Sequence, residues 1–308
     1  MSGTPIISVV VATYNRADLL DGCFNSLVRQ VGCEGQYEVI IVNNNCTDNT
    51  AEIAAEYAAK YPFFKVIDEP VPGASVARNA GWREARAAYV AFMDDDARAM
   101  PDWISRAIEI IREHEPDIFG GSIYPFYLTN RPVWFKDQYE IRRVLDTPGW
   151  LNDRQYISGS NLFFQKDLLD KLGGFDTEVG PKGDAFAFGE ETLLIRHARE
   201  YKPGLKAYYH PELMVEHLAP PRKMTVPHYF RVRYLIGKSG YVLFGDYGWR
   251  WRDWVGRFFL TAGRLVFKGM IKVWFRDRER YPYWQQYQVE EVAPLMDYVG
   301  RLAMLIGR

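Results

Sequence analysis

Three consecutive carboxylates, Asp94, Asp95 and Asp96, follow directly on the apolar run 88–93. Adjacent like charges raise one another's pKa and repel unless a positive group lies among them. Because side chains alternate along an extended chain, we expect Asp94 and Asp96 to face one way and Asp95 the other. Two carboxylates on one side suit a hard divalent cation, Mg²⁺ or Mn²⁺, that keeps positions free for phosphate oxygens. The alternative is that the three aspartates only promote a turn before the next helix.

The N-terminal part repeats a unit of strand, polar loop and helix. Apolar runs predict strands at residues 6–12, 37–42, 63–67 and 88–93. Helical patterns, each beginning after a polar segment, are predicted at residues 50–61, 75–87, 101–113 and 190–201. Strands that are apolar throughout and alternate with helices indicate a parallel sheet covered on both faces. In such sheets ligands bind beyond the carboxyl ends of the strands, which is where the three aspartates lie.

This regular alternation stops after residue 113. Residues 120–150 are rich in Tyr, Trp, Phe and Pro without a clear period, which predicts a loop or insertion that lines a site. A strand is expected around 155–165, and two short strands are expected at 205–209 and 212–218.

Composition and charge restrict the class of protein. The 308 residues carry a formal net charge of −1, which argues against a general nucleic-acid binder. Three cysteines with no metal-ligand spacing indicate a reducing compartment, and no apolar segment approaches the length of a membrane span, so we expect a cytoplasmic protein. From residue 220 onward, however, sixteen Lys or Arg stand against seven Asp or Glu, which suggests an anionic surface as a partner.

Six sequence blocks together resemble the family 2 glycosyltransferases of the GT-A fold. In chain order they are VVVATYNRADLL, VIIVNNNCTDNT, GASVARNAGW, YVAFMDDDARAMPDW, ISGSNLFFQKDLLDKLGGFDTEVG and GEETLLIRHARE. The resemblance implies an α/β, Rossmann-like, mostly parallel sheet flanked by helices, with a catalytic domain over residues 1–220 and a helical extension over 221–308. It also implies a nucleotide-sugar donor and inversion of the anomeric carbon.

The resemblance places the nucleotide base at the ends of the first two strands. Thr13, Tyr14 and Arg16 would hold the base, although Tyr14 could instead pack under the sheet. The family often has an aspartate on the second loop that accepts the imide proton of uracil, and this chain has Asn43 and Asn44 there. An amide oxygen still accepts that proton, but the charge-assisted hydrogen bond is lost. A UDP-sugar is the favoured donor, with GDP- and dTDP-sugars as alternatives.

The resemblance also assigns the diphosphate and metal positions. Asp96 matches the metal position, while Asp94 and Asp95 lie toward the metal-bound phosphate and the ribose. His217 matches a place that often supplies a further metal contact, although a lone histidine at a strand end is as often structural. Arg78 is expected near the diphosphate or the acidic cluster, where its fixed charge offsets the carboxylates.

The acceptor side is assigned to the block GEET and to the block SGSN. By resemblance, Glu191 is the general base that deprotonates the acceptor hydroxyl, and Glu190 lies on the acceptor side. Adjacent helical residues point about 100° apart, so only one of the two glutamates can face the acceptor, and Glu190 stays open as the alternative base. Acidic residues in a first helical turn are also favoured by the helix dipole alone. Gly159 and Asn161, together with the aromatic stretch 124–150, would border the acceptor.

The C-terminal part contains a basic and aromatic amphipathic segment. Arg264, Lys268 and Lys272 recur every four residues among apolar positions, and Trp249 and Trp251 precede them, with Trp254 close by. Such a helix is typical of one that lies in a membrane interface, with docking on the catalytic domain or on a second subunit as the alternative.

Together these features predict an inverting, metal-dependent glycosyltransferase at the cytoplasmic face of a membrane, acting on a glycan or lipid-linked acceptor in the assembly of a polysaccharide or other surface glycan. Two other classes stay open. A nucleotidyltransferase shares the acidic cation site but does not need a base at Glu191, and an inactive sugar-binding or scaffolding protein is compatible with the asparagines that replace aspartate.

Overall fold

A computed structural model describes residues 3–178, 189–244, 251–272 and 276–306. These residues form two compact units. The first consists mainly of residues up to 126, 140–178 and 190–218, and the second mainly of residues 127–139 and those from 219 onward. Each unit is described below by itself.

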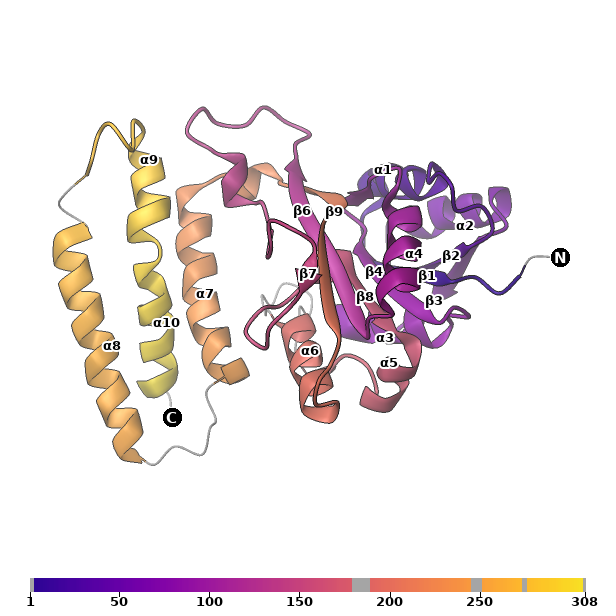
Figure 1. The fold of residues 1–308 in the computed structure, drawn as a ribbon. Coiled ribbons are helices and arrows are strands. Elements are labelled where there is room, and N and C mark those ends of the chain that lie inside the picture. Colours follow the sequence, from indigo (N-terminus) through magenta and orange to yellow (C-terminus); the bar gives the residue numbers. More distant parts are fainter. Residues whose placement is uncertain (1–2, 179–188, 245–250, 273–275, 307–308) are drawn as a thin grey trace. The chain divides into compact units, whose positions relative to one another are not determined.

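The first unit is built on a mixed sheet whose strand order is β3-β2-β1-β4-β8-β6-β9-β5, with β7 also paired to β9 (Figure 1). Its strands are β1 Ile7–Thr13, β2 Tyr37–Asn43, β3 Phe64–Asp68, β4 Tyr89–Asp94, β5 Ala97–Ala99, β6 Ile118–Phe126, β7 Gly149–Trp150, β8 Leu162–Gln165 and β9 Ala207–Leu218. Its helices are α1 Ala17–Val28, α2 Thr50–Lys60, α3 Ala74–Arg83, α4 Trp103–His114, the 3₁₀ turn η2 Gly159–Asn161, α5 Lys166–Leu172 and α6 Glu190–Tyr201.

The first four strands pair in parallel, as the alternation of apolar runs and helices predicts. β1 pairs with β2 and β4, and β2 pairs with β3, all in parallel register. Parallel neighbours end at the same edge, so the last residues of these strands lie in one row. The α/β sheet flanked by helices that the sequence predicts is confirmed.

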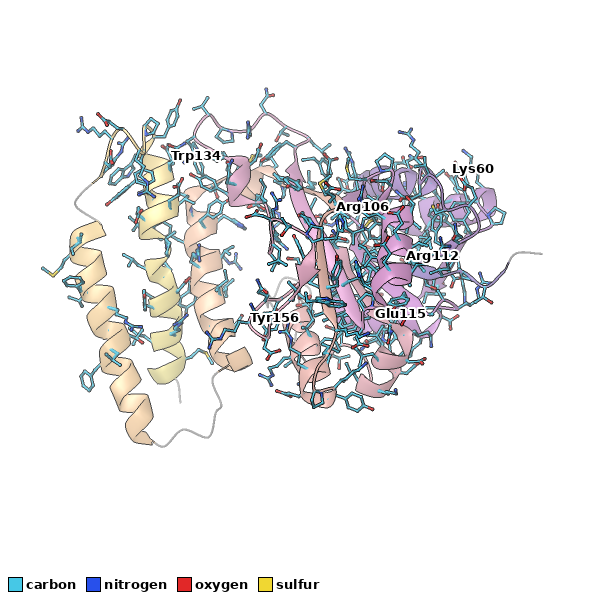
Figure 2. The ribbon with its side chains drawn as sticks, viewed as in Figure 1. Lys60, Arg106, Arg112, Glu115, Trp134 and Tyr156 are labelled. Atoms are coloured by element: carbon cyan, nitrogen blue, oxygen red, sulfur yellow. The ribbon has the colours of Figure 1, made fainter. Side chains whose placement is uncertain are left out.

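Helices cover both faces of this sheet because alternate strand residues point to opposite sides. On one face, α1 and α4 pack against Val9, Val11 and Ile41. On the other face, α3, α5 and α6 pack against Val10, Ile40 and Val90. Arg106 and Arg112 are labelled on α4 (Figure 2), and Arg106 pairs with Glu212 on β9 at 3.1 Å.

The prediction of a loop or insertion beginning at residue 120 is wrong for residues 120–126, which belong to strand β6. Two glycines at 120 and 121 lower the strand propensity of this stretch and concealed the strand. The structure explains them by close backbone approach. A Cβ at Gly121 would lie 1.8 Å from the Leu213 carbonyl oxygen, and one at Gly120 would lie 2.2 Å from that of Asn161.

The last two predicted strands form one element, β9. It pairs with β6 in parallel, and the register shifts between Gly121 and Ile123, where the facing residues jump from His210 to Val215. This irregularity interrupts the apolar pattern and made one strand resemble two. The strand expected around 155–165 begins only at Leu162, because the turn η2 precedes it.

The second unit is helical apart from its loops. Its elements are the 3₁₀ turns η1 Asp137–Tyr139 and η3 Pro221–Lys223, the π-helical turn η4 Gln288–Val292, and the helices α7 Val226–Phe244, α8 Trp251–Lys272, α9 Trp284–Tyr287 and α10 Leu295–Ile306. α7 and α10 approach closely at small residues, since a Cβ at Gly237 would lie 2.3 Å from the Asp297 carbonyl oxygen. Among the described residues, none of the helices has the length and apolar character that crossing a bilayer requires.

Candidate functional site

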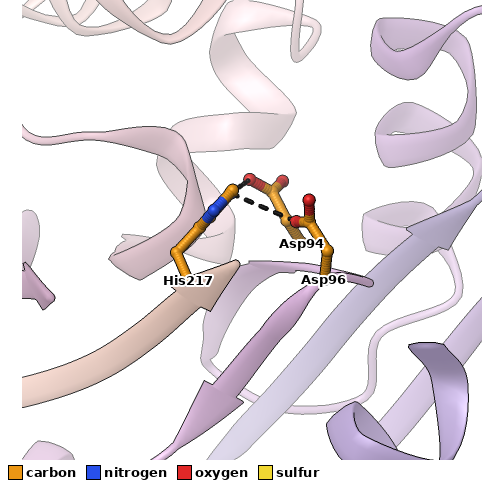
Figure 3. Close-up of side chains that lie close together, drawn as sticks. All are labelled: Asp94, Asp96 and His217. Atoms are coloured by element: carbon orange, nitrogen blue, oxygen red, sulfur yellow. Dashed lines mark hydrogen bonds and ion pairs between the residues drawn. The ribbon is translucent and has the colours of Figure 1, made fainter. Parts of the chain in front are cut away.

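Asp94, Asp96 and His217 converge at the carboxyl edge of the sheet (Figure 3). The His217 Nε2 lies 3.3 Å from Asp94 Oδ2 and 3.1 Å from Asp96 Oδ1. One ligand atom from each residue fits within 4.8 Å of the others. The His217 Nδ1 lies 3.1 Å from the Leu218 carbonyl oxygen, where a proton on Nδ1 orients the ring. Nε2 faces the two carboxylates and would have to release the proton that it donates to them before it could bind a cation. Two hard oxygens and one imidazole nitrogen form a donor set that suits Mn²⁺ or Mg²⁺.

Strand pairing brings His217 to the two aspartates from a distant part of the sequence. Asp94 ends β4 and Asp96 directly precedes β5, which pairs antiparallel with β9 so that Ala97 faces His217. The Leu218 amide donates a hydrogen bond of 2.9 Å to the Asp96 carbonyl oxygen. The histidine therefore reaches the cluster through backbone geometry, which sequence spacing alone does not reveal.

Asp95 points away from this triad, but Asp95 and Asp96 lie in the turn between β4 and β5 and not in an extended strand. The Asp95 Oδ1 lies 4.0 Å from the Arg16 Nε. Burial, assisted by the neighbouring charge of Asp96, raises the pKa of Asp95 to about 7. This carboxylate therefore faces the Arg16 side of the edge and not His217.

Arg78 is the fixed positive charge among the carboxylates. Its Nη2 donates to Asp94 Oδ1 at 3.0 Å, and its Nη1 donates to Glu190 Oε1 at 2.9 Å. Burial alone lowers the pKa of Arg78, but the charges of Asp94 and Glu190 outweigh it and raise that pKa. Burial would likewise raise the pKa of Asp94, but the hydrogen bond from His217 and the charge of Arg78 hold it well below its usual range. Arg78 therefore joins the acidic cluster on β4 to the first turn of α6.

Glu191 is the second acidic residue of α6 and lies beside Gly159. A Cβ at Gly159 would lie 3.6 Å from the Glu191 Cδ, which is van der Waals contact and places Gly159 directly beside the carboxyl group. Burial and then the charge of Glu190 raise the pKa of Glu191 to about 7. The two adjacent glutamates thus differ: Glu190 is held by Arg78, and Glu191 is a carboxyl group that gains and loses its proton near neutral pH.

The residues expected at the nucleotide base occupy the ends of β1 and β2. Tyr14 follows β1 and is half exposed, and Thr13 is buried at the strand end. Asn43 ends β2, and its Nδ2 donates to Asp68 Oδ1 at 2.7 Å. Asn44 is buried, with its Nδ2 donating to the Glu69 and Val71 carbonyl oxygens and its Oδ1 accepting from the Gly73 amide. Asn44 therefore holds the turn that leads into α3.

Asn161 lies beneath the site and is fully buried. Its Oδ1 accepts from the Trp103 indole at 2.9 Å, and its Nδ2 donates to the Leu213 carbonyl oxygen at 2.7 Å. Its side chain joins α4 to β9. Its neighbour Ser160, which was missed from the sequence, accepts a hydrogen bond of 3.3 Å from the Asp94 amide and so helps to position that carboxylate.

The aromatic stretch expected on the acceptor side is divided between the two units. Residues 127–139 belong to the second unit, where Trp134 and Phe135 pack with Met224 and Val289. Residues 140–150 belong to the first unit.

Replacing Arg78 by methionine should destabilise the protein, because the buried carboxylate of Glu190 and the partly buried one of Asp94 lose their common partner. We expect the free energy of unfolding to fall by about 3–5 kcal/mol, as when one member of a buried ion pair is removed. The control is Arg83→Met on the same helix, where the side chain is exposed and the change should be within about 0.5 kcal/mol. Denaturant unfolding measures both, and equal midpoints would contradict the pairing.

Comparison with known proteins is consistent with this geometry. The sequence model described as "Glycosyl transferase family 2" matches residues 8–173. The chain is 27% identical over 184 residues to Glycosyltransferase AglE of Haloferax volcanii, covering 59% of this chain and 60% of that protein. It is 28% identical over 225 residues to the Glucosyl-dolichyl phosphate glucuronosyltransferase of the same organism, covering 68% of each. The chain thus spans about 60% of the length of the first of these relatives.

Solved structures share the fold at low sequence identity. The mannosyltransferase PcManGT of Pyrobaculum calidifontis, in complex with GDP-Man and Mn²⁺, superimposes with a TM-score of 0.63 at 19% identity, covering 97% of this chain and 87% of that one. A fragment of S. aureus TarS in complex with UDP gives a TM-score of 0.54 at 18% identity, covering 98% and 92%. The family match extends over more than half of the chain, and this protein belongs to glycosyltransferase family 2.

Proposed function

We propose that this protein is an inverting glycosyltransferase that moves a sugar from a nucleotide-sugar donor to an acceptor hydroxyl in a single displacement. The observation that carries the proposal is the arrangement around Arg78. This residue joins Asp94 of the triad to Glu190, and Glu190 adjoins a carboxyl group, Glu191, whose pKa is raised to about 7. A cation site and a general base are thus connected through one side chain.

Asp94, Asp96 and His217 are the residues that would hold Mn²⁺ or Mg²⁺. When bound, such an ion neutralises the negative charge of a departing nucleoside diphosphate. Arg78 contributes a permanent charge on the same side, and its short bonds to two carboxylates fix its orientation. Fixed charges of this kind stabilise a transition state without reorganising during the reaction.

The nucleotide would lie along the carboxyl edge of the parallel strands. Tyr14 offers an exposed aromatic face for the base, Thr13 precedes it at the end of β1, and the Arg16 guanidinium lies 4.0 Å from Asp95, the residue after β4. We keep a UDP-sugar as the favoured donor, with GDP- and dTDP-sugars as alternatives. The structural neighbours include both classes, since PcManGT is in complex with GDP-Man and TarS is in complex with UDP.

Glu191 would take the proton of the acceptor hydroxyl. A general base works best when its pKa lies near the working pH, and about 7 meets that condition. Glu191 is partly exposed, which would let an acceptor hydroxyl approach its carboxyl group. Glu190 is less suited to act as the general base, because its carboxylate is paired with the Arg78 guanidinium.

Glu191→Gln should lower turnover by about 10²–10⁴-fold while donor binding is retained, because the amide keeps the shape but cannot accept the proton. In the wild type, activity should rise as the pH increases through about 7, since the carboxyl group loses its proton there, and the variant should lack this rise. Released nucleotide from UDP-, GDP- and dTDP-sugars with Mn²⁺ is the readout.

The control for this experiment is Glu200→Gln, at the exposed end of the same helix, which should keep wild-type turnover and the same pH profile. Turnover of Glu191→Gln equal to that of the wild type would remove the base and favour a nucleotidyltransferase or a binding protein.

We further propose that the protein works at the cytoplasmic face of a membrane on a lipid-linked or glycan acceptor, in the assembly of a polysaccharide or other surface glycan. One long side of α8 is apolar and exposed, with Phe259, Phe267 and Met270 each about two-thirds accessible and Arg264 beside them. The structure does not describe the side chains of five further residues of the predicted basic and aromatic segment, Lys268, Lys272, Trp249, Trp251 and Trp254. The three cysteines are free thiols, which fits a reducing compartment. The relative named for glucosyl-dolichyl phosphate supports a lipid-linked acceptor.

Liposome flotation tests the membrane proposal. We expect the wild type to float with vesicles that contain anionic lipid and much less with neutral ones, because basic residues add to the apolar contact. Replacing Phe259, Phe267 and Met270 together by serine should abolish flotation without changing donor hydrolysis. Equal flotation of the variant would exclude this surface.

A further inference from the structure

We propose that Asp68, at the end of β3, accepts the ring N–H of the donor's nucleobase and that Asn43 positions it. This inference rests on the proposed function. It assigns recognition of the base to Asp68 on β3, where the resemblance pointed to Asn43 and Asn44 at the end of β2. The ligand class is a nucleotide whose base carries a ring N–H on its pairing edge, as uracil, thymine and guanine do. Cytosine and adenine present a ring nitrogen acceptor at that place instead.

The strand register brings Asp68 into the row of donor residues. Thr13 faces Asn43 across β1 and β2, and Asn43 faces Asp68 across β2 and β3. Residues that face each other in this way point to the same side of a parallel sheet. Asp68 therefore shares an edge and a face with Thr13, and its carboxylate is exposed, whereas Asn43 is partly buried.

The amide of Asn43 is oriented by its neighbour. Its Nδ2 donates to Asp68 Oδ1 at 2.7 Å, and its Oδ1 is buried and has no hydrogen-bond partner among the described residues. Turning the amide over would place its oxygen against the carboxylate and lose the hydrogen bond. The amide oxygen is thus directed away from solvent, and the accessible acceptor of this pair is Asp68.

Asn44 does not offer a substitute acceptor. Its oxygen accepts from the Gly73 amide at 2.9 Å, and its nitrogen donates to two carbonyl oxygens. Taking part in base recognition would break the turn before α3, which carries Arg78. The carboxylate of Glu69, directly after β3, accepts from the Val71 amide at 2.8 Å. Asp68 is therefore the more exposed of the two carboxylates at the end of β3 and is not engaged by the backbone of this turn.

Asp68 also lies at a suitable distance from the triad. Asp95 follows β4, and β3 is three strands away in the order β3-β2-β1-β4. Three strand spacings of about 4.8 Å give roughly 14 Å, which is comparable to the length of a nucleoside diphosphate. Tyr14, half exposed at the end of β1, lies between the two ends.

A carboxylate at this position distinguishes bases that present a ring N–H donor from bases that present a ring nitrogen lone pair. It accepts the N3–H of uracil or the N1–H of guanine in a charge-assisted hydrogen bond, and it repels the lone pair of cytosine N3 or adenine N1. Asparagine in its place can donate to that lone pair. Asp68→Asn should therefore weaken the binding of uracil and guanine nucleotides and strengthen the binding of cytosine and adenine nucleotides relative to them.

Calorimetric titration of the full chain with UDP, GDP, CDP, ADP and pyrophosphate, each with Mn²⁺, tests this assignment. Asp68→Asn should bind the preferred nucleotide, UDP or GDP, about ten- to a hundredfold more weakly, which is the expected loss for one hydrogen bond to a charged group. Its affinity for pyrophosphate should not change, and CDP should gain relative to UDP. Asn43→Ala should shift the same ratios in the same direction by less.

Glu52→Gln on the exposed side of α2 is the matched control, because it changes the net charge equally. The inference would be overturned if Asp68→Asn kept the wild-type ratios of nucleotide affinities, or if it lost affinity for nucleotide and pyrophosphate equally. Either result would leave the proposed function intact. No binding of any nucleotide to the wild type would overturn both.

Discussion

The arrangement of the site depends on the buried ion pairs of Arg78. Three aspartates in sequence and two glutamates at a helix start would repel one another strongly in a partly buried space. Arg78 bonds to one residue of each group, Asp94 at 3.0 Å and Glu190 at 2.9 Å. The planar guanidinium can make both contacts at once because its donors are fixed in a fork, which a lysine ammonium does not provide.

The acidic residues of the site differ in their pKa values. The hydrogen bond from His217 and the charge of Arg78 hold the pKa of Asp94 low, whereas burial, assisted by the charge of Asp96 or of Glu190, raises the pKa of Asp95 and of Glu191 to about 7. Carboxyl groups of one chemical type are thus separated by their surroundings into one that stays charged and two that exchange a proton near neutral pH. The ion pairs of Arg78 also fix α6 to the sheet edge, so Glu191 stays beside Gly159.

Much of this could be read from the sequence, because strand periodicity and the acidic cluster are local signals. The four parallel strands follow from the alternation of apolar runs with helices, whereas the opposite directions of Asp94 and Asp95 arise where β4 ends in the turn that leads to β5. β6 could not be read, since its two glycines are explained only by the carbonyl oxygens of Leu213 and Asn161, which lie far along the chain. Asp68 was missed for a similar reason: its significance comes from the register between β2 and β3 and from the buried oxygen of Asn43.

The central claim is that Asp94, Asp96 and His217 together complete a cation site that nucleotide binding requires. Calorimetric titration of Mn²⁺ in the presence of UDP or GDP tests it most directly, with Asp96→Asn as the variant and circular dichroism as the check of folding. We expect one ion to bind the wild type and the variant, still folded, to bind it more than about tenfold more weakly. Equal affinity in the folded variant would contradict the account.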